Sequence, residues 1–217
     1  MHKSINNLAL INKQIKSKFD DINNLNIIAV SKTFPMSEID PLIKSGHQHF
    51  GENKVQEAVE KWSESKISIK NLKLHMVGKL QTNKVKNAVE IFDYIHSLDS
   101  LKLANKISDE IHKKSKKIKI FIQINLGGEK QKNGIEPSDL EDFYNNCKTL
   151  KLDIIGTMCI PPESQDPKHF FKDLLQLNRK INLSEISMGM TNDYLDALEY
   201  KSTYLRIGTG IFGKRTK

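Results

Sequence analysis

Residues Ile27-Ile28-Ala29-Val30-Ser31-Lys32-Thr33 form an apolar run that ends in a single lysine and stops before Pro35. Runs that are apolar on both faces are typical of strands in parallel sheets covered by helices. We therefore expect a strand that places Lys32 at the floor of a pocket. An amine held against apolar walls is costly to keep charged, and the uncharged amine can attack a carbonyl carbon to form a Schiff base. A lysine that only ends the strand and extends to water is the alternative, and this segment alone does not decide between them.

The rest of the chain alternates between segments with strand and helix patterns. Apolar residues at helical spacing predict an opening helix over residues 5–19. Strands are predicted at 27–31, 47–50, 72–77, 94–97, 118–125, 152–158, 185–188 and 204–207. Helices are predicted between them at 38–44, 55–62, 85–91, 101–112, 137–147, 170–177 and 194–198, with Ser37 and either Asp99 or Ser100 as N-caps. Strands that alternate with helices after one extra helix are the signature of a (β/α)8 TIM barrel, and a doubly wound open sheet is the alternative.

Length and composition limit the class of protein. A chain of 217 residues without a low-complexity linker predicts one domain over residues 1–217. The first residues lack the apolar region of a secretion signal, and no apolar segment is long enough to span a bilayer, so we expect a cytoplasmic protein. Cys147 and Cys159 form no CxxC pair, which indicates reduced thiols rather than a disulfide or a cysteine zinc site.

The net charge of +8 raises the possibility of nucleic-acid binding. However, the lysines are scattered along nearly every helical segment, and the densest run, residues 113–117, lies between a predicted helix and a predicted strand. A solvated helix end explains that run. We expect no nucleic-acid partner and keep this function only as a weak alternative.

In a TIM barrel, the reactive side chains gather at the C-terminal ends of the strands. The predicted ends carry Lys32, Asn53, His75, His96, Asn125, Met158, Ser187 and Arg206. His75 and His96 could be acid–base groups or hydrogen-bonded interior histidines, and Glu52 could face the pocket or cap the next helix. His47 and His49 offer two imidazoles on one strand face but no third ligand, so no metal site is predicted.

Two loops near the C-terminus favour a phosphate site. Ser187-Met188-Gly189-Met190-Thr191 follows the seventh predicted strand, and Arg206-Ile207-Gly208-Thr209-Gly210-Ile211-Phe212-Gly213 follows the eighth. In TIM barrels these two loops commonly bind phosphate through glycine amides, to which Ser187 and Thr209 could add hydroxyl donors. The GxGxxG pattern in the second loop lacks the βαβ unit of a dinucleotide site. Ordinary turn glycines remain the alternative for each loop taken alone.

A series of motifs resembles the pyridoxal phosphate homeostasis proteins, which are single-domain relatives of the alanine racemase barrel. The motifs are Ala29-Val30-Ser31-Lys32, Phe50-Gly51-Glu52-Asn53-Lys54-Val55-Gln56-Glu57, His75-Met76-Val77-Gly78-Lys79-Leu80-Gln81-Thr82-Asn83-Lys84, His96-Ser97-Leu98-Asp99, Gln123-Ile124-Asn125, Ser187-Met188-Gly189-Met190 and Arg206-Ile207-Gly208-Thr209. The resemblance runs from about Ile27 to Arg215. It departs at Leu74, where the family usually has tryptophan, and in the loop over residues 127–134.

The resemblance implies that pyridoxal 5′-phosphate (PLP) is the cofactor. Lys32 then corresponds to the lysine that forms the Schiff base, and Ser187, Met188, Gly208 and Thr209 correspond to the phosphate ligands. The resemblance also places Arg206 against the pyridine nitrogen, and Asn53 against the ring or its hydroxyl group. Because a guanidinium can only donate hydrogen bonds, it would leave that nitrogen unprotonated, which disfavours transamination.

The function implied by the resemblance is PLP homeostasis in the cell: a monomeric carrier or buffer, rather than an enzyme, with PLP-dependent apoenzymes as candidate recipients and no membrane partner. Racemases of this barrel type add a second domain that supplies an opposing tyrosine. Without a partner base, an exposed Schiff base should turn over little substrate. The alternative from another class is an amino-acid racemase or lyase that uses His75 or Lys32 as its base.

Overall fold

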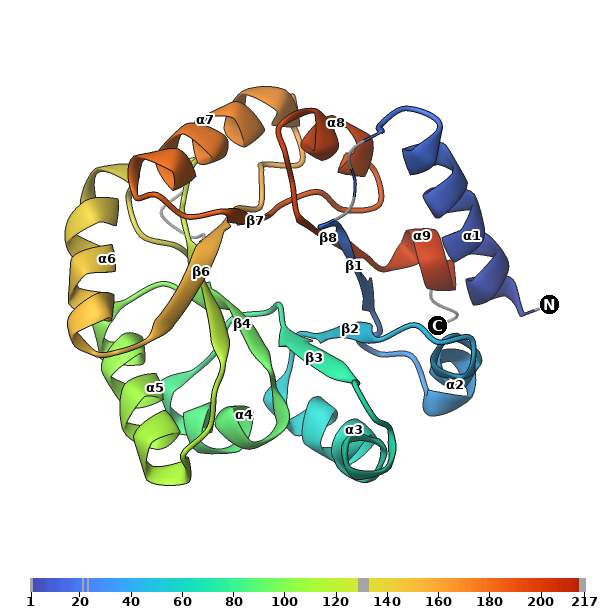
Figure 1. The fold of residues 1–217 in the computed structure, drawn as a ribbon, viewed down its shortest axis with the longest axis horizontal. Coiled ribbons are helices and arrows are strands. Elements are labelled where there is room, and N and C mark those ends of the chain that lie inside the picture. The colour runs from blue at the N-terminus through green and yellow to red at the C-terminus, as the bar shows by residue number, and fades with distance from the viewer. Residues whose placement is uncertain (1, 21, 23, 129–132, 215–217) are drawn as a thin grey trace.

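The protein is a closed parallel barrel, seen here in a computed structural model that describes residues 2–20, 22, 24–128 and 133–214. Its strands pair in chain order, and β1 also pairs with β8, which closes the barrel (Figure 1). The strands are β1 (Asn26–Val30), β2 (His49–Glu52), β3 (Lys73–Met76), β4 (Tyr94–Leu98), β5 (Lys119–Gln123), β6 (Asp153–Met158), β7 (Glu185–Ser187) and β8 (Tyr204–Ile207). The predicted (β/α)8 barrel is confirmed, and the open sheet is excluded.

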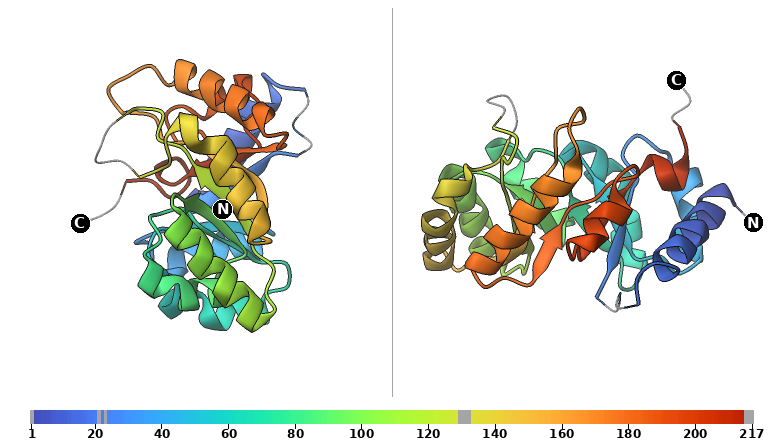
Figure 2. Two further views of the ribbon diagram at one scale, coloured as in Figure 1. Left: turned by 90° about the vertical axis from the view of Figure 1, so that its left-hand side faces the viewer. Right: turned by 90° about the horizontal axis from the view of Figure 1, so that it is seen from above.

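Helices surround the barrel (Figure 1). They are α1 (Lys3–Lys16), α2 (Met36–Lys44), α3 (Val55–Ser68), α4 (Val85–Ile91), α5 (Leu101–Lys114), α6 (Leu140–Thr149), α7 (Pro167–Lys180), α8 (Tyr194–Glu199) and the short α9 (Thr209–Phe212), which the sequence did not predict. The predicted extra N-terminal helix, α1, packs against α9 and α2 (Figure 2). Within the described ranges, no helix has both the length and the apolar character needed to cross a membrane.

Alternation along the strands creates two apolar regions. On β1, Ile27 and Ala29 face outward into the layer between strands and helices, whereas Ile28 and Val30 face the barrel interior. The interior group also contains Tyr94, Phe121, Met158 and Tyr204. The same alternation directs the side chain two residues after Val30, Lys32, toward the C-terminal mouth of the barrel.

Most predicted boundaries differ from the observed ones by a few residues. Ser100 is confirmed as the N-cap of α5, since its side chain accepts a hydrogen bond from the amide of Leu103 at 3.4 Å. Ser37 as an N-cap is wrong, because α2 already begins at Met36 with Pro35 in the N-cap position. In the loop over residues 127–134, residues 129–132 lie outside the described residues.

Candidate functional site

A cavity of about 680 Å³ opens at the C-terminal end of the barrel. Val30, Val77 and Ile160 contribute apolar wall. Lys32 and Arg206 also line the cavity, together with residues of the loops after β6, β7 and β8. This is the end of a TIM barrel at which binding residues are expected.

Lys32 is half-buried and lines the cavity. The backbone on both sides of it is fixed by side chains from β2 and α3. Ser31 donates from its hydroxyl to Oε1 of Glu52 at 2.8 Å, and the amide of Thr33 donates to Oε1 of Glu57 at 2.5 Å. Thr33 has a left-handed φ of 68°, which is uncommon for a residue other than glycine, so this contact helps to hold a strained turn directly after Lys32.

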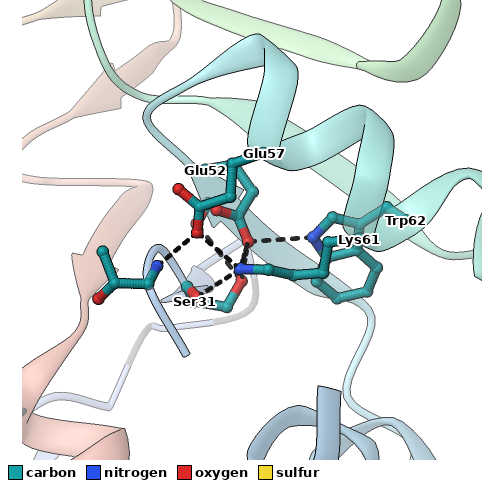
Figure 3. Close-up of polar contacts among 7 residues, drawn as sticks. Ser31, Glu52, Glu57, Lys61 and Trp62 are labelled. Carbon is teal, nitrogen blue, oxygen red and sulfur yellow. Dashed lines mark hydrogen bonds and ion pairs between the residues drawn. The ribbon is translucent and has the colours of Figure 1, made fainter. Parts of the chain in front are cut away.

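The residues that hold Ser31 and Thr33 form one connected cluster, buried at Glu52 and Trp62 and half-buried at Glu57 (Figure 3). Lys61 joins the two carboxylates, donating to Oε1 of Glu52 at 3.0 Å and to Oε1 of Glu57 at 2.9 Å, and it also donates to the carbonyl of Ser31 at 3.0 Å. Trp62 adds a third donor to Glu52 through Nε1 at 3.0 Å. Burial raises the pKa of Glu52, although Trp62, Lys61 and Ser31 oppose this shift. Glu52 therefore neither lines the cavity nor caps α3, and its contacts support the strand end that carries Lys32.

Arg206, the third residue of β8, is 5% exposed and is fixed at two points. Its Nη1 donates to Oγ of Ser187 at 2.7 Å, and its Nη2 donates to the carbonyl of Cys159 at 2.8 Å. Burial lowers the pKa of Arg206, but a guanidinium stays charged at physiological pH. The cavity thus has a fixed cation that can only donate hydrogen bonds.

The two loops predicted to form a phosphate site meet at the cavity. The hydroxyl of Thr209 donates to Oγ1 of Thr191 at 3.1 Å, and the amide of Gly210 donates to the same oxygen at 3.0 Å. Thr191, Gly208 and Thr209 all line the cavity. Sequence reasoning did not assign a role to Thr191, although it is a hydroxyl residue in the loop already selected.

The other predicted site residues lie next to the cavity without lining it. Ser187 is fully buried, and its hydroxyl lies between Arg206 and Nδ1 of His96, 2.8 Å away. The side chain of Met188 is buried in the outer core, and its carbonyl accepts from Ser202 at 2.7 Å. Lys32, Arg206, Gly208 and Thr209 therefore line the cavity, and Ser187 reaches it through Arg206.

Asn53 follows β2 and has a buried Oδ1 atom without a hydrogen-bond partner in the part of the chain that the structure describes. The backbone of Asn53 lies so close to Gly78 that a Cβ atom at position 78 would be 2.4 Å from the carbonyl oxygen of Asn53. Val77, next to Gly78, lines the cavity. Asn53 thus lies beside the cavity wall without lining the cavity, and its unpaired acceptor is covered by surrounding atoms.

The histidines do not line the cavity. His75 and His96 are fully buried in the barrel interior and hydrogen-bonded to each other. Of the two interpretations of these residues, that of hydrogen-bonded interior histidines is confirmed. His49 bonds to His75, while His47 bonds to the carbonyl of His49 at 3.0 Å. Nowhere in residues 2–20, 22, 24–128 and 133–214 does a group of three or more side chains have the arrangement of a metal site.

Comparisons with known proteins agree with this geometry. The sequence profile of the alanine racemase N-terminal domain matches residues 7–216. The pyridoxal phosphate homeostasis protein of Haemophilus influenzae is 34% identical over 96% of this chain and 94% of that protein. The protein of the same name in Escherichia coli K12 is 35% identical over 88% of this chain and 86% of that protein.

Solved structures show the same barrel. PipY of Synechococcus elongatus, with PLP bound, superposes with a TM-score of 0.86 at 32% identity and covers 97% of this chain and 100% of that chain. An alanine racemase of Clostridium difficile superposes with a TM-score of 0.74 over 99% of this chain and 56% of that chain, and at 14% identity it shows the fold alone. The chain belongs to the pyridoxal phosphate homeostasis protein family, which shares its barrel with the N-terminal domain of alanine racemase.

Proposed function

We propose that this protein binds PLP in the cavity and takes part in cofactor homeostasis as a carrier or buffer. The observation that carries the proposal is the meeting of Lys32, Arg206 and the hydroxyl-bearing loops after β7 and β8 on one cavity. PipY binds PLP in its solved structure, and the relatives from H. influenzae and E. coli are named for PLP homeostasis.

The residues present fit the chemistry of this cofactor. The cavity volume of about 680 Å³ lies within the range of roughly 300–1,000 Å³ typical of small-molecule sites. Arg206 offers a donor for an unprotonated ring nitrogen, and Val30 and Val77 offer apolar surface. We assign Asn53, which lies beside the cavity wall, to the ring or its hydroxyl group. When bound, PLP supplies an aldehyde whose carbon can be attacked by a lysine amine, forming a carbon–nitrogen double bond with release of water.

Each residue of the site has a proposed role. Lys32 provides the amine, and the Glu52 cluster holds its backbone. Gly208 and Thr209 bind the phosphate with the help of the loop that contains Met188 and Thr191, because these two loops supply hydroxyls and amides to the cavity. Ser187 acts on the site by orienting Arg206.

The cavity lining favours a carrier over a racemase or lyase. Among the described residues, no tyrosine, histidine or cysteine side chain lines the cavity. Asp193 accepts from the amide of Met190 at 2.5 Å, and Asp196 pairs with Lys168 at 3.3 Å. Glu163 is the remaining carboxylate of the lining, and it is exposed to solvent. A site that offers only a solvated carboxylate as opposing base should turn over little substrate. Incubation of the loaded protein with individual L-amino acids, followed by chiral analysis and keto-acid detection, tests this, and robust turnover would refute the carrier role.

Borohydride reduction tests the binding site itself. We expect mass spectrometry of the reduced protein to locate a pyridoxyl group on the peptide that contains Lys32. The Lys32→Ala variant should give no such adduct, while Lys79→Ala serves as the matched control and should label normally. A pyridoxyl group on Lys54 or Lys79 in the unaltered protein would contradict the proposal.

We further propose that the protein acts as a cytoplasmic monomer that delivers PLP to apoenzymes. Sedimentation of the loaded protein measures its oligomeric state, and cell fractionation measures its location. For delivery, the loaded protein is mixed with a PLP-dependent apoenzyme and a phosphatase that destroys free PLP. Activation of the apoenzyme under these conditions is expected, and its absence would leave only the buffering role.

A further inference from the structure

A single row of hydrogen bonds crosses the barrel interior from Arg206 to His49. Arg206 donates to Oγ of Ser187 at 2.7 Å, and Oγ lies 2.8 Å from Nδ1 of His96. Nε2 of His96 lies 2.9 Å from Nδ1 of His75, and Nε2 of His75 lies 2.9 Å from Nδ1 of His49. We call His49, His75 and His96 the histidine row. It begins at the first residue of β2 and ends beside the cavity cation.

The three rings of the histidine row are neutral near physiological pH. Burial, together with the charge of neighbouring groups, holds the pKa values of His75 and His96 well below the ordinary value. Burial also lowers the pKa of His49 to about 4. The charged or titratable groups that face the row are His47, Lys66, Lys73, Asp93, Tyr94, Tyr204 and Arg206.

Neutral imidazoles make the row a one-directional chain. Each ring has one N–H donor and one acceptor nitrogen. If two neighbouring rings carried opposite tautomers, two donors or two acceptors would face each other at 2.9 Å, which is costly, most of all for the fully buried pair of His75 and His96. The three rings must therefore all carry the proton on Nδ1 or all carry it on Nε2.

The Ser187 end selects between these two arrangements. Arg206 can only donate to Oγ. With the protons on Nδ1, His96 would also donate to Oγ, and the hydroxyl hydrogen of Ser187 would have no acceptor among its contacts in the described part of the chain. With the protons on Nε2, Ser187 donates to His96 and each bond along the row has one donor and one acceptor.

We propose that His49, His75 and His96 all carry their proton on Nε2 and act as positioning residues that fix the hydroxyl of Ser187 and, through it, the guanidinium of Arg206. The effect of this positioning on cofactor binding rests on the proposed function. The row does not deliver a proton to the cavity, because a guanidinium stays protonated and interrupts any transfer. Its role is to keep Arg206 aimed as a donor.

Aromatic stacking keeps the rings in line. His75 stacks on Tyr94 with ring centroids 4.2 Å apart and planes 15° apart. His96 stacks on Phe121 with centroids 4.3 Å apart and planes 19° apart. A ring held between an aromatic face and two hydrogen bonds cannot flip without losing both contacts. The geometry therefore favours one ordered proton arrangement.

Two-bond ¹H–¹⁵N spectra of histidine-labelled protein read the tautomers directly, without cofactor. We expect the Nε2–H pattern for all three rings from about pH 5.5 to 8, assigned by single substitutions. An Nδ1–H pattern or an imidazolium in any ring of the row would overturn the proposal. Because no PLP is needed, failure of PLP binding would refute the proposed function while these spectra still decide the proton arrangement.

Variants at the half-buried end of the row test the coupling without disturbing the deep core. His49→Leu removes the acceptor for Nε2–H of His75, so His75 and His96 should switch to Nδ1–H. The hydroxyl of Ser187 then accepts from both His96 and Arg206 while its own hydrogen has no acceptor, so the position of Arg206 is less well fixed and PLP should bind about tenfold more weakly. His49→Gln restores an amide oxygen as acceptor and should keep both the tautomers and the affinity. His47→Leu, next to the row, is the matched control. Unchanged tautomers in His49→Leu, or a switch without a change in affinity, would overturn the positioning role.

Discussion

The Nζ atom of Lys61 lies 3.0 Å from Oε1 of Glu52, and this ion pair is almost completely buried, with side-chain exposures of 10% and 0%. The same carboxylate oxygen accepts from Ser31 and Trp62, so the pair links α3 to the strand end that carries Lys32. A buried charge that loses its partner is strongly destabilising, whereas removing both charges can be nearly neutral. The pair is therefore both a structural support and a test of how Lys32 is held.

Glu52→Leu should destabilise the protein by about 1–3 kcal/mol, because the N–H of Trp62 and the hydroxyl of Ser31 lose their acceptor while Lys61 keeps Glu57 as a partner. The double variant Glu52→Leu with Lys61→Met should recover the part of that loss that comes from the weakened pairing of Lys61. Urea unfolding followed by circular dichroism measures both. If the double variant is as unstable as the sum of the two single variants, the pair is not coupled in the way the contacts indicate.

Ser187→Ala should weaken PLP binding by about tenfold, because a hydrogen bond to a charged group is lost and one N–H of Arg206 is left without an acceptor. Equilibrium titration monitored by absorbance measures the change. Ser202→Ala is the matched control: Ser202 is also buried, but it bonds to the carbonyl of Met188 and not to Arg206. Equal effects of the two substitutions would mean that the loop after β7, rather than the position of Arg206, determines the affinity.

Gly78→Ala should disturb Asn53, since the new methyl group would lie 2.4 Å from the carbonyl oxygen of Asn53 and 2.7 Å from its Cα atom. Backbone cannot move away as easily as a flexible side chain, so we expect weaker PLP binding as well as lower stability. Gly46→Ala is the control, because Gly46 has a left-handed φ of 92° but no atoms crowd its Cβ position. That variant should lose stability while keeping its affinity for PLP.

Sequence reasoning found the parts of the site that follow from local pattern. The apolar run before Lys32 and the glycine-containing loops after β7 and β8 each stand out within a few residues, and Lys32, Arg206, Gly208 and Thr209 do line the cavity. The contacts that hold them were not visible in this way. His96 and Ser187 are 91 residues apart in the chain, and they meet only because the barrel closes.

Contacts made by helices are a second feature that the sequence did not predict. The bond between Trp62 and Glu52 depends on the rotation of α3 against the barrel, which the amphipathic pattern fixes only to a broad face. Trp62 therefore appears in the sequence as one more core residue, although its ring N–H has a specific acceptor. Thr191 was missed for a related reason, since its role depends on how two loops meet.

The histidine row should make the protein sensitive to mild acid. The pKa values of His49, His75 and His96 are lower in the folded protein than the ordinary 6.5, so the unfolded chain binds more protons below that pH. Stability therefore increases with pH through this window and falls as pH drops below 6.5, by up to about 1.4 kcal/mol per pH unit for each histidine.

Urea unfolding at a series of pH values should resolve the contribution of His49. Its folded pKa of about 4 and ordinary value of 6.5 define the window over which its protonation destabilises the fold. Glu52 acts in the opposite direction, because its raised pKa makes stability fall as pH increases above its ordinary value. Since Glu52 is unchanged in His49→Gln, the difference between this variant and the unaltered protein isolates the histidine. The variant should lose stability less steeply on acidification, because its unfolding takes up about one proton fewer between those pH limits. Parallel curves for the two proteins would show that His49 is not held neutral by the fold.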